Sequence, residues 1–219
     1  MTGFQRDTKD WYLGKEPLAL VSNNIIKYVR ARAGKKILDF GCGLGGYSAR
    51  LNQLGFSCTG ADFNEKYLAI AKSLGVEVYQ VKGLKLDFPD NYFDTSILIE
   101  VLEHLADPLM ILKEIKRVSK NNVLLTVPNC TQANRLLTSQ VAFEHMLDLD
   151  HKNYFTAATL RDLLINEFSS VKVLEKEAID QALINNLLPA PLALPLDLLF
   201  QLKLLRKNFF FRLYAEAKK

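Results

Sequence analysis

The sequence predicts an α/β fold in which helices cover a doubly wound, Rossmann-like parallel sheet. Two observations support this prediction. Short apolar runs alternate with amphipathic stretches over the first 128 residues, which is the pattern of successive β-α-β units. In addition, a glycine turn at 41–46 directly follows the first apolar run. Such a turn joins a strand to a helix where open α/β sheets hold nucleotides and nucleosides.

Each expected element follows from local signals. Pro17 and Gly34 bracket a first helix at 18–32, Asp107-Pro108 begins a later helix as cap and first-turn proline, and Thr156 caps another. The last strand lacks a regular crossover helix before it, so it could join the sheet antiparallel. The expected strands are 36–40, 57–62, 76–80, 93–99, 122–127, 170–177 and 208–216, and the other expected helices are 47–54, 64–73, 108–118 and 156–167.

Length and composition indicate one domain. The chain has 219 residues and a net charge of +4, and the absence of a long basic run argues against nucleic acid as a partner. Its three cysteines are isolated and odd in number, which suggests a reducing, cytoplasmic setting. The polar N-terminus does not resemble a signal peptide, and no apolar run reaches the length of a membrane span.

The glycine turn fits two cofactor templates. Gly41, Gly43 and Gly46 fit the dinucleotide pattern G-x-G-x-x-G, whereas Gly41, Gly43 and Gly45 fit the G-x-G-x-G turn used for S-adenosylmethionine. Asp62 ends the second apolar run and suits the ribose hydroxyls of either cofactor.

Asp39, just before the glycines, separates the two templates better. A carboxylate there would repel a pyrophosphate, but it would attract the sulfonium and ammonium groups of S-adenosylmethionine. The plainer alternative is that Asp39 caps loop N–H groups.

Four motifs in order carry a family resemblance. These are Leu38–Gly45, Gly60–Phe63, Phe88–Asp94 and Glu100–Pro108. Together they resemble class I S-adenosylmethionine-dependent methyltransferases, in the broad group that includes quinone-biosynthesis and sugar O-methyltransferases. The resemblance is strong over 36–128 and extends more weakly to Asp150–Leu160. It implies a seven-stranded sheet whose last strand is antiparallel, a helical cap at 1–34, a cofactor-binding core at 35–128 and a substrate-side half at 129–219.

The resemblance also implies a set of cofactor-binding residues. Asp39 and Gly41 would lie along the methionine part of the cofactor with Ile99 and Glu100, Gly43 and Gly45 would shape the turn, Asp62 would bind the ribose, and Phe63, Gly83 and Leu84 would surround the adenine. Lys82 departs from the pattern, because many relatives have an aspartate there. A lysine cannot accept the adenine amino proton, so Asp87 or a backbone carbonyl would have to do so.

The expected reaction is methyl transfer to a small-molecule, sugar or lipid-linked acceptor, and oxygen is the favoured methylated atom. A hydroxyl acceptor calls for a base, and His151 is the leading candidate, with Asp148 or Asp150 to orient it; the alternative is a hydrogen-bonded lid residue. His104 is expected to be structural, and His145 a surface or cap residue. No metal site is expected, because Asp148, Asp150 and His151 do not form a full ligand set. An N- or C-methyltransferase, a non-catalytic cofactor-binding or membrane-docked protein and, less well supported, an NAD-dependent oxidoreductase remain alternatives.

Two further segments have open roles. The apolar segment 179–206 contains Pro189, Pro191 and Pro195, which are expected to prevent one straight helix, and basic residues follow. It could cover the acceptor pocket, form a homodimer contact or make peripheral membrane contact. Trp11 and Tyr12 could close over the cofactor with Lys15, or simply cap the core.

Overall fold

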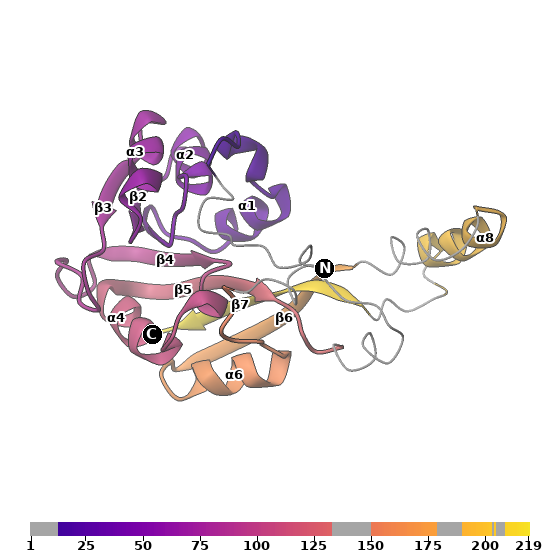
Figure 1. The fold of residues 1–219 in the computed structure, drawn as a ribbon. Coiled ribbons are helices and arrows are strands. Elements are labelled where there is room, and N and C mark those ends of the chain that lie inside the picture. Colours follow the sequence, from indigo (N-terminus) through magenta and orange to yellow (C-terminus); the bar gives the residue numbers. More distant parts are fainter. Residues whose placement is uncertain (1–12, 133–149, 179–189, 203, 205–208) are drawn as a thin grey trace, which may run out of the picture.

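A seven-stranded sheet forms the centre of the computed structural model, with helices on both faces (Figure 1). The structure describes residues 13–132, 150–178, 190–202, 204 and 209–219, so Trp11, Tyr12, His145 and Asp148 lie outside the described residues. The strands pair in the order β3-β2-β1-β4-β5-β7-β6. They are β1 Lys36–Phe40, β2 Ser57–Asp62, β3 Glu77–Gln80, β4 Phe93–Ile99, β5 Ser119–Pro128, β6 Ser170–Ala178 and β7 Phe210–Lys218.

Strand β7 runs opposite to its two neighbours, so the predicted reversal of the last strand is confirmed. Its pairing places Arg212 opposite Pro128 of β5, at the carboxyl end of that strand. The strand begins and ends two residues later than predicted, at 210–218 instead of 208–216. Because β6 pairs with β7 on its other side, the carboxyl ends of β1, β4, β5 and β6 share one edge of the sheet.

Helices cover both faces of the sheet. On one face, Ile25 of α1 (Asn23–Arg30) and Leu51 of α2 (Gly46–Gln53) pack on Ile37 and Ile97, and α3 (Glu65–Ser73) packs beside α2. The other face is covered by α4 (Pro108–Val118) and α6 (Ala157–Ile165), whose buried leucines and isoleucines belong to the larger core cluster. The expected caps are confirmed, since Asp107 accepts the Met110 N–H and Thr156 accepts the Thr159 N–H.

The prediction of one continuous helix at 18–32 is wrong. A 3-10 turn, η1 (Pro17–Leu20), is separated from α1 by extended backbone at Val21 and Ser22. The reason is tertiary, because the Ser22 N–H donates to the Tyr47 hydroxyl of α2 at 3.1 Å. That contact fixes the chain in an extended conformation where the sequence pattern alone allows a helix to continue.

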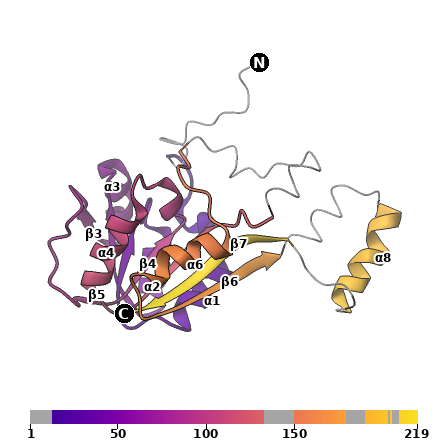
Figure 2. The same cartoon turned by 90° about the horizontal axis from the view of Figure 1, so that it is seen from below.

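The apolar segment also differs from its prediction. A single helix, α8 (Ala190–Gln201), contains Pro195 in its interior. Pro191 lies in the first turn, where the backbone N–H has no helical partner, so only the one hydrogen bond of Pro195 is lost. In both views α8 stands apart from the sheet and covers neither face (Figures 1 and 2). Among the described helices, α8 included, none has the length and apolar content needed to cross a bilayer.

Candidate active site

The glycine turn takes the conformation of the G-x-G-x-G template. Gly41, Gly43 and Gly45 have φ values of 75°, 53° and 78°, a region that L-residues with a side chain rarely adopt. Gly46 instead begins α2 with ordinary helical geometry. The three left-handed positions are therefore those of the S-adenosylmethionine pattern.

Close packing explains two of these glycines, and open space surrounds the third. A Cβ atom at Gly41 would lie 2.5 Å from the Val101 side chain, and one at Gly45 would lie 2.5 Å from the Ala71 Cβ. A Cβ atom at Gly43 would meet nothing within 4 Å. The backbone of Gly43 is thus open to the close approach of a ligand.

Asp62 ties the glycine turn to the end of β2. Its Oδ2 accepts the Gly43 N–H at 2.9 Å, and its Oδ1 accepts the Asn64 N–H at 2.8 Å. Burial raises the pKa of Asp62. The Phe63 N–H also donates to this carboxylate. A carboxylate has about four acceptor sites, so the side chain retains the capacity to accept from a ribose hydroxyl.

Asp39 is almost fully buried at the end of β1, with 2% of its surface exposed. The Ser48 hydroxyl of α2 donates to its Oδ2 at 2.6 Å, and the Ser48 backbone N–H, in the first turn of α2, also donates to this carboxylate. Burial raises the pKa of Asp39 to about 7, the Ser48 hydrogen bond opposes the rise, and the charge of Asp62 adds to it. A cation beside Asp39 would favour the ionised carboxylate.

Apolar side chains are exposed in the loops that follow β2 and β3. Phe63 is 50% exposed and packs edge-on against Phe40, with 6.0 Å between the ring centroids. Leu84 is 54% exposed, and the space around Gly83 is open. These side chains suit a flat aromatic ligand, because exposed apolar surface gains from being covered.

Lys82, which departs from the motif of the resembled family, lies in the same loop as Gly83 and Leu84. Lys82 is exposed, and the Asp87 carboxylate accepts the Tyr79 hydroxyl at 3.1 Å. A hydrogen bond from the adenine amino group to Asp87 would therefore share an acceptor that is already used.

Ile99 ends β4, and Glu100 directly follows it. Glu100 has a φ of 54°, its N–H donates to the Thr126 carbonyl at 3.0 Å, and the Thr126 hydroxyl donates to its Oε1 at 2.8 Å. Its Oε2 lies 3.3 Å from the Arg212 Nε. Burial raises the pKa of Glu100, and the positive charge of Arg212 opposes this rise.

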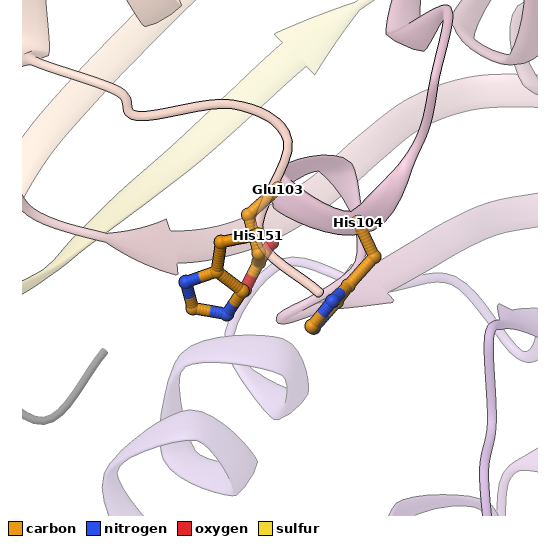
Figure 3. A group of neighbouring side chains, drawn as sticks. All are labelled: Glu103, His104 and His151. Carbon is orange, nitrogen blue, oxygen red and sulfur yellow. The ribbon is translucent and has the colours of Figure 1, made fainter. Parts of the chain in front are cut away.

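A second cluster lies at the same edge, beyond β4 (Figure 3). The rings of His104 and His151 are 4.7 Å apart in an edge-on arrangement, and Glu103 is 1% exposed beside them. The Lys152 and Asn153 N–H groups donate to the Glu103 carbonyl at 2.8 and 3.0 Å. These bonds fasten the chain that carries His151 onto η2 (Leu102–His104).

The sequence prediction names Asp148 or Asp150 as the group that orients His151. The Asp150 backbone oxygen lies 3.4 Å from the His104 Nδ1, and Asp148 lies outside the described residues. Sequence reasoning missed Glu103 as a neighbour of His151. The available signal was its position directly before His104, just past the carboxyl end of β4.

This cluster also has the composition of a metal site, whereas the sequence predicts no metal site. The potential donor atoms of Glu103, His104 and His151 lie within 4.8 Å of one another. One carboxylate and two imidazoles are ligands that zinc and related divalent metals accept. The acids close to His151 in the sequence are Asp148 and Asp150, whereas this carboxylate comes from η2, far from His151 along the chain but beside it in the fold.

Three features of this structure are typical of the class I methyltransferase fold. They are the antiparallel seventh strand, the glycine turn between β1 and α2, and the acidic residues near the ends of β1 and β2. Residues 38–127 match the family model described as a methyltransferase domain. Residues 38–127 thus form a methyltransferase domain, and the chain has the fold of S-adenosylmethionine-dependent methyltransferases.

Similar proteins agree with this assignment. The chain is 32% identical over 127 residues to a ubiquinone biosynthesis O-methyltransferase of Pseudomonas aeruginosa. The aligned region covers 53% of this chain and 54% of that protein. A SAM-dependent methyltransferase from Archaeoglobus fulgidus superposes with a TM-score of 0.70 at 23% identity, covering 96% of this chain and 97% of the other. Magnesium protoporphyrin IX methyltransferase from Synechocystis, a structure with bound SAH, gives a TM-score of 0.59 at 16% identity and covers 90% and 81%. The chain spans about half the length of the curated relatives it matches.

Proposed function

We propose that this protein is an S-adenosylmethionine-dependent O-methyltransferase that acts on a small-molecule acceptor, including sugar or lipid-linked ones. The observation that carries the proposal is the closeness of two sites. Val101 packs against the Gly41 position of the glycine turn, and the cluster of Glu103, His104 and His151 begins two residues later. A site suited to the methyl donor thus adjoins groups that can take a proton from a hydroxyl. The name of the curated relatives supports transfer to oxygen.

The residues of the first site fit the proposed cofactor. S-adenosylmethionine would supply a methyl group already activated on a sulfonium. The open backbone at Gly43 would admit it, Asp62 would accept from a ribose hydroxyl, and Phe63 would cover one face of the adenine. In this proposal Asp39 and Glu100 give the methionine end a negative surrounding, which suits a sulfonium and an ammonium.

In this proposal His151 is the base. An imidazole nitrogen of His151 would accept the acceptor's hydroxyl proton as the new bond forms. The carboxylate of Glu103 would stabilise the resulting imidazolium, and the contact with His104 would hold the ring in place. A base acts only in the transfer step, so it should affect turnover and leave cofactor binding unchanged.

His151→Ala is therefore expected to lower turnover about 100-fold or more with unchanged affinity for S-adenosylhomocysteine. The measurement is transfer of labelled methyl groups by wild type and variant, alongside calorimetry with the cofactor product. Wild-type turnover in the variant would exclude His151 as the base. Chelator treatment of the wild-type enzyme adds a second readout: loss of turnover that magnesium or zinc restores would mean that the cluster acts through a metal ion.

The acceptor class is tested by the same transfer assay on a panel of phenols, sugars and quinol-type lipids. Labelling of hydroxyl acceptors supports the proposal. Labelling confined to amines or carbon acids would make the protein an N- or C-methyltransferase. Cofactor binding with no transfer to any class would favour a non-catalytic binding protein.

We infer in addition that α8 makes peripheral membrane contact, as a lipid-linked acceptor would require. Leu194 and Leu198 lie one helical turn apart and are 67% and 53% exposed, and Leu202, a further turn on, is 59% exposed. Lys203, Arg206 and Lys207 follow in the sequence. Exposed leucines beside basic residues are the composition of helices that lie on anionic lipid surfaces.

The wild-type protein is expected to sediment with anionic vesicles at low salt, and Leu194→Ser/Leu198→Ser is expected to stay in the supernatant. Leu18→Ser serves as a matched control, since Leu18 is an exposed leucine on η1. Failure of the wild type to bind vesicles, with dimers seen by light scattering, would assign the leucines to a homodimer contact instead.

A further inference from the structure

Two glutamates with unusual backbone conformations meet at one arginine. Among the described residues, Asn91, Glu100 and Glu177 are the non-glycine residues with positive φ, and Glu100 and Glu177 have values of 54° and 61°. Both of their carboxylates reach Arg212. The Glu100 Oε2 is 3.3 Å from the Arg212 Nε, and the Glu177 Oε2 accepts a hydrogen bond from the Arg212 Nη1.

Further contacts fix this group. The Tyr214 hydroxyl donates to the Glu177 Oε1 at 2.6 Å, and the Thr126 hydroxyl donates to the Glu100 Oε1 at 2.8 Å. The three charged side chains are only 16–26% exposed. An L-residue keeps a left-handed conformation only when its surroundings determine it, and a planar guanidinium between two carboxylates is well suited to do so.

The position of the group connects two parts of the molecule. Arg212 lies opposite Pro128 at the carboxyl end of β5, and Glu100 directly follows β4 at the same edge. Glu177 is near the end of β6, and Arg212 is near the start of β7. The segment that carries α8 connects β6 to β7. The ion pair between Glu177 and Arg212 therefore holds the end of β6 and the start of β7 together beside Glu100.

We propose that Arg212 is a positioning residue of the cofactor site, which holds Glu100 in its left-handed conformation with Glu177 as a second anchor. The inference rests on the proposed function, in which Glu100 lies at the methionine end of the cofactor. The two carboxylates of Glu100 and Glu177 together exceed the single positive charge of Arg212, so its role is to orient Glu100 and not to bind an anionic substrate.

Arg212→Met is expected to weaken binding of S-adenosylhomocysteine at least about tenfold, measured by calorimetry on the full chain. The KM for S-adenosylmethionine should rise in parallel, while kcat at saturating cofactor should change less. Arg212→Lys keeps the charge but not the fork, so it should fall between wild type and Arg212→Met. If Arg212 acts through Glu100, Arg212→Met should have no further effect in a Glu100→Gly background.

Arg32→Met is the matched control. Arg32 forms an ion pair with Glu216 at 3.5 Å. Glu216 lies in β7, as Arg212 does, but near the other end of that strand. Loss of that pair should leave cofactor binding unchanged. If Arg212→Met binds S-adenosylhomocysteine within about twofold of wild type, or if Arg32→Met weakens binding equally, Arg212 is merely structural and the inference is wrong. A wild-type chain that does not bind S-adenosylhomocysteine would instead contradict the proposed function.

Discussion

Gly45→Ala is expected to reduce the free energy of unfolding by about 2–5 kcal/mol, from a forced left-handed conformation and overpacking together. Gly45 has a φ of 78°, and an added Cβ atom would lie 2.5 Å from the Ala71 Cβ and 2.9 Å from its Cα. Because Ala71 is fully buried in α3, its backbone would have to shift. Urea denaturation of the purified variant measures the loss.

Gly43→Ala is the comparison that separates packing from ligand approach. Gly43 also has a positive φ, but nothing lies within 4 Å of an added Cβ, so we expect a cost of only about 1–2 kcal/mol. The methyl group would, however, occupy the space proposed for the cofactor, so binding of S-adenosylhomocysteine should be lost. Equal destabilisation by the two variants, or wild-type binding by Gly43→Ala, would contradict this account of the turn.

Asp39→Asn is expected to weaken S-adenosylmethionine binding and to remove its dependence on pH. The folded pKa of Asp39 is raised to about 7 by burial, and the positively charged ligand would favour the ionised form. Wild-type affinity should therefore rise with pH, by up to about tenfold per unit below 7, and level off above it. Calorimetry between pH 5.5 and 8.5 checks this. S-adenosylhomocysteine, which lacks the sulfonium charge, should show a shallower rise.

The stability of the ligand-free protein should respond to Asp39 with the opposite sign. A carboxyl group whose folded pKa is raised binds more protons in the folded than in the unfolded state between its ordinary pKa and about 7. Its contribution to stability is thus full at low pH and is lost as the pH rises through that window. Asp39→Asn should flatten this part of the melting profile. If Asp39→Asn has the same pH dependence as wild type in both melting and binding, Asp39 is not the group that titrates in this range.

The sequence predicted those parts of the fold that local patterns determine. The strands at 36–40, 57–62 and 93–99 have the predicted bounds, because buried parallel strands are continuous apolar runs between turns. The split of the first helix was not predictable, since it depends on the Tyr47 hydroxyl meeting Ser22. The helix through Pro195 was missed because a proline costs a helix one hydrogen bond and some strain, and neighbouring residues can compensate for both.

The candidate site also has a part that the local sequence predicts and a part that depends on tertiary contacts. The glycines, Asp39 and Asp62 are read from consecutive residues of a strand and its turn. The approach of Glu103 to His151 and the ion pairs of Arg212 with Glu100 and Glu177 join segments far apart in the sequence. No local pattern carries such contacts, so only the folded chain reveals them.

Whether the glycine turn binds S-adenosylmethionine is decided by calorimetric titration of the wild-type protein with S-adenosylhomocysteine and, separately, with NAD. We expect saturable binding of S-adenosylhomocysteine with one site per chain and no measurable heat with NAD. Tight NAD binding without a response to S-adenosylhomocysteine would contradict this expectation.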